Sequence, residues 1–305
     1  MDDRGSLTTE LRNPRSMRLD QLDIGAAFDL IQSEDATITS AVAAARADIC
    51  RAIDLVVSAF SRGGRLIYVG AGTSGRLGVL DAAECPPTFL TDPSMVVGII
   101  AGGKTALTSS IEGAEDSPEE GGRAIDAQHV CADDLVFGIA TGGTTPFVHG
   151  ALARAKERGA RTVFFACVSK TEVADGADVS IRVITGGEVL TGSTRMKAGT
   201  ATKMVLNMVT TIAMTRIGKV YQNLMVDVRT GANRKLVDRA VRIIGAVTRQ
   251  SRDAAAELLE RADGRVKTAL VMHHLDVDRE EALRRLESAG GFVHEVLNKG
   301  VSSHA

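Results

Sequence analysis

Two loops rich in glycine and hydroxyl side chains have the composition of anion-binding loops. Residues 70–75 read Gly-Ala-Gly-Thr-Ser-Gly and fit the pattern G-x-G-x-x-G, and residues 141–146 read Thr-Gly-Gly-Thr-Thr-Pro. Each loop follows an apolar run and precedes a helical pattern, so backbone N–H groups and a helix N-terminus would face a bound anion. The hydroxyls of Thr73 and Ser74 would add hydrogen-bond donors. Two such loops together favour a phosphorylated ligand.

Three interpretations of the first loop remain open on this pattern. A dinucleotide site would need an Asp or Glu at the end of the second strand to bind the ribose. That expected strand ends in Ile-Ala-Gly-Gly-Lys at residues 100–104, without an acid, which favours a monophosphate. A glycine turn that binds nothing is the third interpretation. Neither loop contains the Walker sequence GK[ST], which disfavours an NTPase.

Two carboxylates lie near these loops in the sequence. Glu84 follows the first expected helix and precedes Pro86 and Pro87, which we expect to end regular structure there. Glu115 follows the second expected strand. Two carboxyl groups with opposite protonation states can act as general acid and general base, whereas a single glutamate is usually a solvated surface charge. The residue types therefore indicate a phosphate binder that has groups for acid–base chemistry.

The elements that would position these residues alternate along the middle of the chain. Helical patterns at residues 76–83, 146–158 and 197–217 lie between short apolar runs, which are typical of strands buried on both faces of a sheet. This alternation predicts an α/β fold with a parallel sheet and helices on both faces. In such sheets ligands bind at the carboxyl ends of the strands, where both glycine loops lie. The expected strands are residues 65–69, 95–100, 135–140, 162–167 and 179–184.

Helical segments are expected on both sides of this region. Residues 24–31 predict a short helix, and residues 37–61 predict one long helix. Beyond residue 233, charged helical patterns predict a small bundle in which Asp278 and Glu281 have the spacing of a capping box. We therefore expect an N-terminal helical segment (1–56), an α/β phosphate-binding domain (57–232) and a C-terminal helical bundle (233–305).

The composition excludes several classes of function. The 305 residues carry 36 Lys and Arg against 38 Asp and Glu, so no strongly basic surface for nucleic acid is expected. The longest uncharged run, residues 135–153, contains four glycines, and the opening residues lack the apolar stretch of a signal peptide. We therefore expect no membrane partner. The four cysteines are scattered without a CxxC pair, which predicts a reducing cytoplasm and no metal site.

Five motifs occur in the order that they have in one bacterial enzyme family. Together they make the chain resemble the N-acetylmuramic acid 6-phosphate etherases, which belong to the sugar-isomerase (SIS) domain superfamily. The resemblance covers nearly the whole chain, and five motifs in order are specific where a single glycine loop is not. The motifs are GAGTSGRL (70–77), DAAECPP (81–87), EGAED (112–116), TGSTRMKAGT (191–200) and NLMVDV (223–228).

The resemblance implies a fold and a reaction. The fold would be a five-stranded parallel sheet flanked by helices, a flavodoxin-like three-layer sandwich, with N-terminal helices and a small C-terminal helical bundle. The reaction would cleave the D-lactyl ether of N-acetylmuramic acid 6-phosphate to N-acetylglucosamine 6-phosphate and D-lactate, in the recycling of cell-wall amino sugars. Lactate would leave by elimination from the open-chain aldehyde, and water would then add. The family uses neither a metal nor an organic cofactor.

The family's site residues carry over by position. Glu84 would protonate the departing lactate oxygen, and Glu115 would remove the C2 proton, which is acidic because it lies α to the C1 aldehyde. Glu188 stands where aldose–ketose isomerases of the superfamily often keep a catalytic glutamate, so a role in ring opening or proton transfer is open. The residues expected to hold the phosphate are Thr73, Ser74, Gly75, Gly143, Thr144 and Thr145. Three further residues that could contribute are Ser193, Arg195 and Lys197.

The second loop departs from the family pattern. Many relatives carry Ser-Gly-Arg-Thr-Pro there, and this chain has Gly-Gly-Thr-Thr-Pro at residues 142–146. A serine hydroxyl and an arginine are therefore absent, so the phosphate contacts of this loop do not carry over atom by atom.

Two other functions remain as alternatives. The vertebrate glucokinase regulatory protein resembles this family and senses sugar phosphates without turning them over, but this chain has one SIS domain and retains Glu84 and Glu115. A sugar-phosphate isomerase is the second alternative. The superfamily often shares phosphate sites across a dimer, and the helical pattern at residues 204–214 is apolar. We therefore expect a homodimer whose sites are completed by both chains.

Overall fold

The chain divides into two units in the computed structural model, which describes residues 4–228 and 234–301. The first unit consists of Met1–Ala83 and Pro93–Thr210, and the second of Glu84–Asp92 and Thr211–Ala305. The boundaries drawn from the sequence at residues 56/57 and 232/233 remain a prediction.

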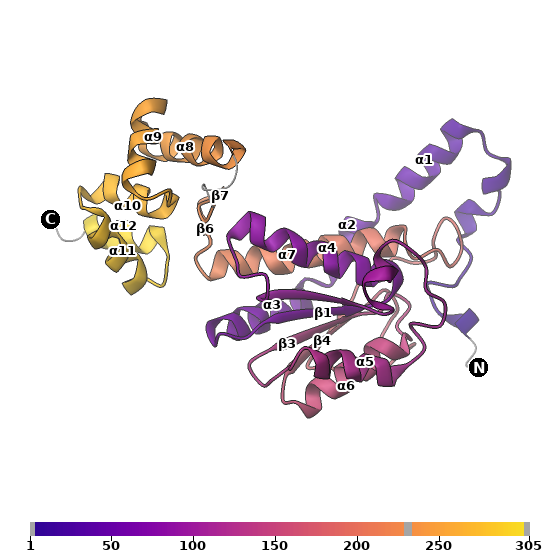
Figure 1. Cartoon of the computed structure of the whole chain (residues 1–305). Helices are drawn as coiled ribbons and strands as arrows, with labels where there is room; N and C mark the ends of the chain where they lie inside the picture. Colours follow the sequence, from indigo (N-terminus) through magenta and orange to yellow (C-terminus); the bar gives the residue numbers. More distant parts are fainter. Residues whose placement is uncertain (1–3, 229–233, 302–305) are drawn as a thin grey trace. The chain divides into compact units, whose positions relative to one another are not determined.

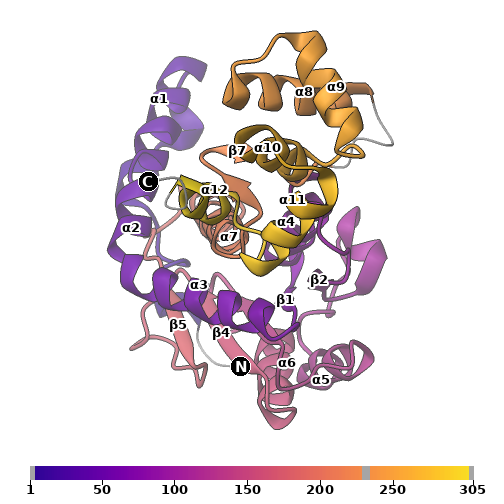
Figure 2. The same ribbon diagram turned by 90° about the vertical axis from the view of Figure 1, so that its left-hand side faces the viewer.

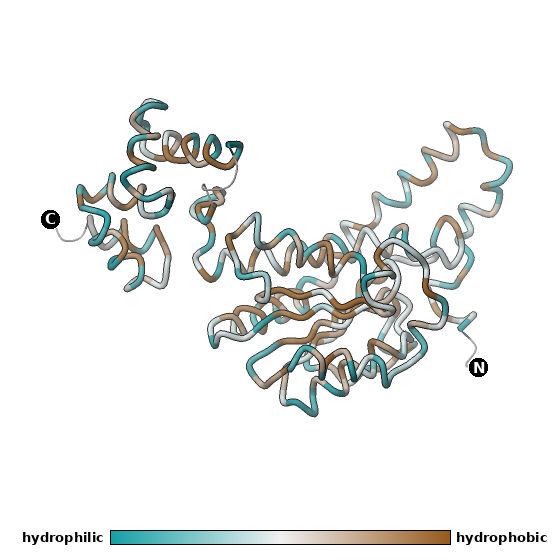
Figure 3. The backbone as a smooth tube through the Cα atoms, viewed as in Figure 1, coloured by the Kyte–Doolittle hydropathy of each residue, from teal (hydrophilic) through white to brown (hydrophobic). Residues whose placement is uncertain are grey.

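A parallel sheet forms the centre of the first unit, as the sequence predicts (Figure 1). Its five strands lie in the order β2-β1-β3-β4-β5, and every neighbouring pair is parallel. All residues of β1 and β3 are buried, which explains their continuous apolar sequence. Figure 3 shows this concentration of hydrophobic residues along the central strands. The strands are β1 (Leu66–Gly70), β2 (Val96–Ile100), β3 (Leu135–Ile139), β4 (Arg161–Ala166) and β5 (Val179–Arg182).

The strand order places the two glycine loops next to each other. The chain leaves β1 for β2 on one side and returns to β3 on the other, so the order reverses between β1 and β3. In doubly wound sheets a ligand binds at this reversal, outside the carboxyl ends of the strands. The last residues of the two strands are paired, Gly70 with Ile139. Both loops therefore begin at the same edge, one strand spacing apart.

Helices cover both faces of the sheet (Figure 1). Helices α5 and α6 lie on one face, and α4 and α7 lie on the opposite face, while α3 packs against β1, β3 and β5. The bounds of α6 and α7 agree with the sequence-based prediction to within one residue at each end. These helices are α3 (Arg46–Ser61), α4 (Gly72–Phe89), α5 (Pro118–Ala127), α6 (Pro146–Glu157) and α7 (Lys197–Arg216).

Two local expectations were wrong, and one further element was not expected. The helix after β1 does not end before Pro86 and Pro87, because both prolines lie in the last turn of α4, where the φ that their rings impose is still helical. The long helix expected at residues 37–61 is broken at Ala45 into α2 (Ile38–Ala44) and α3. An unexpected hairpin follows α7, formed by β6 (Val220–Tyr221) and β7 (Leu224–Met225).

The second unit contains the helical bundle that the sequence predicts (Figure 2). Its buried core includes Ile244, Leu258 and Leu270 from three successive helices. Asp278 caps α11 by accepting a hydrogen bond of 2.8 Å from the backbone N–H of Glu281, as expected. The helices are α8 (Arg234–Thr248), α9 (Arg252–Arg261), α10 (Val266–Leu275), α11 (Arg279–Ser288) and α12 (Val293–Val301).

Short helices complete the described chain. The N-terminal part has three 3-10 turns before α1 (Ile24–Asp35), and a fourth such turn follows β2. Within residues 4–228 and 234–301, every helix is too short or too polar to cross a lipid bilayer. The 3-10 turns are η1 (Arg4–Ser6), η2 (Pro14–Ser16), η3 (Leu19–Gln21) and η4 (Gly103–Leu107).

Helices α5 and α6 touch backbone to backbone through two glycines. A Cβ atom on Gly121 would overlap the carbonyl oxygen of Phe147, and one on Gly150 would overlap that of Pro118. Only glycine allows this approach. The contact fixes the start of α6, which follows the second glycine loop, against the segment that carries Glu115.

We expect Gly121→Ala to lower the free energy of unfolding by about 1–3 kcal/mol, because its methyl group forces the two helices apart. The adjacent Gly122→Ala is a matched control, since its Cβ would lie 3.7 Å from the nearest atom, Arg154 Cβ, and alanine is the better helix former by about 0.5–1 kcal/mol. Urea unfolding of both variants measures this difference. Equal stabilities would contradict the close contact.

Candidate active site

The first glycine loop passes directly into α4. Gly72 has a φ of +51° and begins the helix. Gly75 packs against the end of β1, because a Cβ atom there would lie 2.7 Å from the Gly70 carbonyl oxygen. Ser74 is 7% exposed, and its side chain makes no hydrogen bond to any residue that the structure describes. The hydroxyls of Ser74 and the half-buried Thr73 thus lie in the first turn of α4, where the backbone N–H groups have no partner within the helix.

The second loop is held by hydrogen bonds to its own backbone. Gly143 has a φ of +83° and donates a hydrogen bond of 2.8 Å to the Ala140 carbonyl. Nε2 of His149 lies 2.7 Å from the Gly143 carbonyl oxygen and therefore carries the proton. Thr145 occupies the N-cap position of α6, but its side chain makes no capping hydrogen bond. Its hydroxyl and that of the half-buried Thr144 are thus available to a ligand.

Glu115 lies beside this second loop. Its carbonyl oxygen accepts a hydrogen bond of 3.0 Å from the backbone N–H of Phe147, in the first turn of α6. The Glu115 side chain is exposed. The segment before it is tied to α4, since Arg76 donates to the carbonyls of Leu107 and Ser109, each at 3.1 Å. The tertiary structure thus brings the Glu115 backbone to the end of the second glycine loop.

Glu84 lies elsewhere on α4. It is an exposed residue inside the helix rather than after it. It stands ten residues beyond Ser74, which at the helical rise corresponds to about 15 Å along the axis. Ser74 and Glu84 of one chain are thus separated by a little more than half the length of this helix.

The motif at residues 191–200 lies beside the first loop. A Cβ atom on Gly199 would be 3.6 Å from Thr73 Cγ2, so the first turn of α7 faces the start of α4. Ser193 is half-buried in the turn before α7. Arg195 is exposed and forms no ion pair with any residue that the structure describes.

Glu188 supports the start of α7. It is fully buried, and its two carboxylate oxygens accept hydrogen bonds of 2.9 Å from the backbone N–H groups of Lys197 and Ala198. Burial raises the pKa of Glu188, although these hydrogen bonds oppose the shift. The carboxylate acts as an acceptor for amides at the helix N-terminus, which the helix dipole favours.

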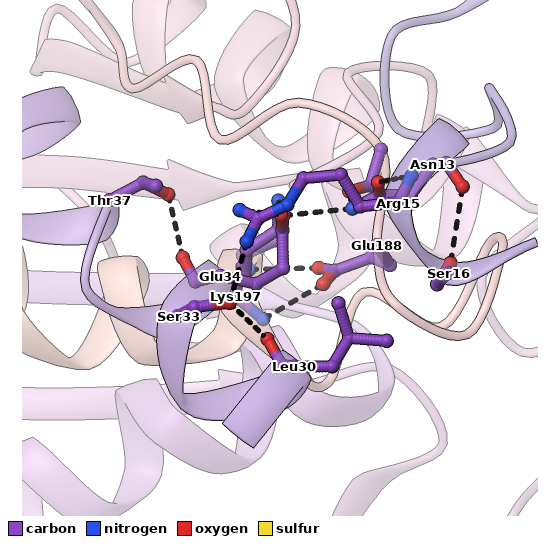
Figure 4. A network of polar contacts seen from close by, with 11 residues as sticks. Asn13, Arg15, Ser16, Leu30, Ser33, Glu34, Thr37, Glu188 and Lys197 are labelled. Atoms are coloured by element: carbon purple, nitrogen blue, oxygen red, sulfur yellow. Dashed lines mark hydrogen bonds and ion pairs between the residues drawn. The ribbon is translucent and has the colours of Figure 1, made fainter. Parts of the chain in front are cut away.

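Lys197 belongs to a buried ion pair rather than to the open edge of the sheet (Figure 4). Its Nζ atom lies 2.7 Å from Glu34 Oε2, and the two side chains are 4% and 7% exposed. Asn13 and Arg15 also donate to Glu34, each at 2.8 Å. Burial raises the pKa of Glu34, but the hydrogen bonds from Lys197 and Asn13 and the charges of Lys197 and Arg15 outweigh it, so this pKa lies below its ordinary value.

The N-terminal segment also lines this edge, although none of the sequence motifs includes it. The Thr8 backbone N–H and hydroxyl both donate to Glu172 Oε1 at 2.6 Å. Thr9 is fully buried near Gly142, and its hydroxyl has no partner within the described part of the chain. Asn13 donates to the Gly187 carbonyl at 3.2 Å. The only signal in the sequence was the polar run before Pro14.

Two comparisons identify the family. Residues 48–156 match the family model of the glucokinase regulatory protein N-terminal SIS domain, and residues 116–212 match that of the SIS domain. A relative from Crocosphaera subtropica, named N-acetylmuramic acid 6-phosphate etherase, is 52% identical over 99% of this chain and 99% of its own length. A relative of the same name from Gloeobacter violaceus is 54% identical over 98% of this chain and 97% of its own.

The chain belongs to the N-acetylmuramic acid 6-phosphate etherase family. The resemblance inferred from the five motifs and the SIS fold are thereby confirmed. The roles assigned to single residues of this etherase remain proposals. Among the described residues of this etherase, no three His, Cys or carboxylate side chains are grouped so that they could hold a metal ion.

The buried ion pair of the etherase yields a stability prediction. We expect Lys197→Met to lower the free energy of unfolding at pH 7 by about 3 kcal/mol, because it leaves the Glu34 carboxylate buried without its ammonium partner. Glu34 has a lowered pKa, so the contribution of its charge is present above its ordinary pKa and is lost as pH falls through the native value. The difference from wild type should therefore shrink toward pH 3.

Urea unfolding at both pH values measures this effect. Lys170→Met is the control, since Lys170 is exposed and without an ion pair among the described residues, and it should change stability by less than about 0.5 kcal/mol. A pH-independent loss in Lys197→Met would contradict the role of the Glu34 charge.

Proposed function

We propose that this chain cleaves the D-lactyl ether of N-acetylmuramic acid 6-phosphate, releasing D-lactate and N-acetylglucosamine 6-phosphate. The observation that carries this proposal is the similarity to named etherases over nearly the whole chain. Incubation of the protein with this substrate, followed by enzymatic detection of D-lactate, tests it. A sugar-phosphate isomerase or a non-catalytic sensor would release no lactate.

Phosphate binding is the first step of the proposed mechanism. The hydroxyls of Thr73, Ser74, Thr144 and Thr145 and the amides at the starts of α4 and α6 would donate to the phosphate oxygens. Gly75 and Gly143 allow the loops to adopt their close-packed conformations. No metal or organic cofactor is part of this proposal.

The elimination would use the two carboxyl groups in opposite protonation states. Glu115, as carboxylate, removes the C2 proton of the open-chain aldehyde, and an enolate-like anion forms. The C3–O bond then breaks as C2=C3 forms, and Glu84, as carboxylic acid, protonates the departing lactate oxygen. Water next adds its hydroxyl to C3 and a proton to C2, which restores the sugar. The position of Glu115 beside the second loop supports its part in this scheme.

We propose that Glu84 acts on the substrate held by a second chain. The bonds from phosphorus to the C3 ether oxygen of an open-chain hexose 6-phosphate span much less than the roughly 15 Å from Ser74 to Glu84 along α4. A homodimer that shares its sites would remove this difference in length, because Glu84 of the second chain could reach the ether oxygen of a substrate bound to the phosphate loops of the first. We place the enzyme in the cytoplasm, which suits its four free cysteines.

We expect Ser74→Ala to raise the dissociation constant of the substrate by about 10–100-fold, because a hydrogen bond to a charged group contributes about 1.5–3 kcal/mol. Titration calorimetry with an inactive Glu115→Gln background measures this affinity without turnover. Ser40→Ala, an exposed serine of α2, is the control. Unchanged binding by Ser74→Ala would remove Ser74 from the phosphate site.

The two carboxylates should fail at different steps. In deuterated water, Glu84→Ala should still exchange the C2 hydrogen of the sugar, because its base is intact, while it releases lactate at least about a hundredfold more slowly. Glu115→Ala should lose both C2 exchange and lactate release. Proton NMR of the sugar together with a lactate assay follows both steps.

Other outcomes would revise the assignment. C2 exchange by Glu115→Ala but not by Glu84→Ala would reverse the two roles. Normal lactate release by both variants would exclude them from the mechanism, and Glu188 would be tested next.

A further inference from the structure

Helix α1 and the turn before it form an arm that is barely buried. We use the term arm for residues 17–35. Figure 1 shows α1 projecting away from the sheet of its own unit. Its only buried residue is Glu34, near its C-terminal end. A helix of 12 residues is marginal in water without a surface to pack on. Within the described chain α1 is held near its C-terminal end, where Glu34 pairs with Lys197.

The arm presents large apolar side chains to solvent. Ile24 is 91% exposed, Phe28 is 62% exposed and Met17 is 48% exposed. Soluble monomers rarely expose several such side chains on one element, and an exposed apolar patch marks an interaction surface.

The arm is also acidic. Residues 17–35 contain five carboxylates and one basic residue, Arg18. The charge of Glu34 is paired with that of Lys197 in a buried ion pair. The other four are exposed and form no ion pair with the described residues, namely Asp20, Asp23, Asp29 and Asp35. A partner surface should therefore combine apolar and basic residues.

Such a surface lies on the same unit, where α4 and α7 run together. The carboxylate of Asp81 on α4 accepts hydrogen bonds from Asn207 at 2.8 Å and Thr210 at 3.2 Å on α7, so the two helices are joined. On this pair Leu80 is 50% exposed and Met208 is 37% exposed. Lys203 is exposed and has no ion pair among the described residues. Burial raises the pKa of Asp81, and the nearby charge of Lys203 partly opposes that rise. We call Leu80, Lys203 and Met208 the α4–α7 face.

We propose that the arm of one chain docks on the α4–α7 face of a second copy of this chain. The two surfaces complement each other in charge, and each carries exposed apolar side chains. Because both lie on one chain, a two-fold axis can exchange two arms and close the assembly as a dimer. The docked arm would then bury its apolar residues and pair its carboxylates with Lys203.

This docking would also deepen the proposed shared site. Leu80 and Glu84 are four residues apart and therefore lie on the same side of α4. An arm seated on Leu80 brings the partner chain next to Glu84, the group that the proposed mechanism requires from the other chain. Only this consequence rests on the proposed function, and the docking itself does not.

Photo-cross-linking of the full-length protein tests the contact. With p-benzoylphenylalanine in place of Phe28, we expect a cross-linked dimer whose attachment sites, found by mass spectrometry, fall within α4 or α7 of the second chain. The control places the same group at Glu157, an exposed residue of α6 on the opposite face of the sheet, and should give no such product. Attachment elsewhere, or no interchain product from position 28, would overturn the proposal.

A second measurement tests the apolar and charge interactions that would hold the arm on the α4–α7 face. Ile24→Ser/Phe28→Ser should weaken dimerisation at least tenfold in sedimentation equilibrium, with an unchanged circular dichroism spectrum. Asp29→Lys should also weaken it, and Lys203→Glu in the same chain should restore part of the loss. A dimer of wild-type affinity in the double serine variant would refute the docking. A wild-type dimer that cross-links as expected but releases no lactate would refute the proposed function instead.

Discussion

The pairing of β1 with β3 is the constraint on which the candidate site depends. Because Gly70 and Ile139 stand opposite each other at the ends of these strands, two loops that are about 70 residues apart in sequence begin side by side. The reversal of strand order at this point leaves the edge between the loops open to a ligand. Glycines then set how closely α4 and α6 approach the sheet and each other, and a side chain at Gly75 or Gly121 would displace the loop it supports.

Buried carboxylates join the remaining segments to this edge. Glu34 accepts hydrogen bonds from side chains of the N-terminal segment and of α7. Glu188 accepts hydrogen bonds from the first backbone N–H groups of α7. Each is satisfied by several hydrogen bonds, which is the condition under which a buried charge is tolerated. Lys197 therefore serves the same purpose as Glu188, since both hold the turn at residues 191–196 next to Thr73. A charged residue in a family motif can thus act by positioning other residues rather than by contact with a ligand.

The two candidate catalytic carboxylates have different structural supports. Glu115 is tied through its backbone to α6 and lies with the loops that would bind phosphate. Glu84 lies farther along α4 and is exposed, as is Leu80 one helical turn before it. In the proposed dimer the acid and the base reach one substrate from different chains, so assembly and catalysis would be coupled. The exposed acidic arm and the α4–α7 face would supply the contact that makes this coupling specific.

The sequence by itself determined the strands, most helices and the chemistry of the two loops. Apolar runs such as residues 135–140 and the strand–glycine–helix order are local signals, and neighbouring residues decide them. The five motifs also sufficed to identify the family. Local signals predicted the ends of helices less well, because long-range packing also influences where a helix stops. Examples are the break at Ala45 and the continuation of α4 through Pro86.

Only the tertiary structure decided which charges are free to act. Nothing in the sequence distinguishes Lys197, which is buried against Glu34 from a helix more than 160 residues away, from the exposed Arg195 two residues earlier. Likewise, Thr9 and Asn13 lie in an irregular polar segment that reaches the site only because the chain folds back over the ends of β3, β4 and β5. Secondary structure depends largely on neighbouring residues, so the helices and strands could be predicted from the sequence. The hydrogen bonds and ion pairs of the site join distant residues and depend on the whole fold, so they could not.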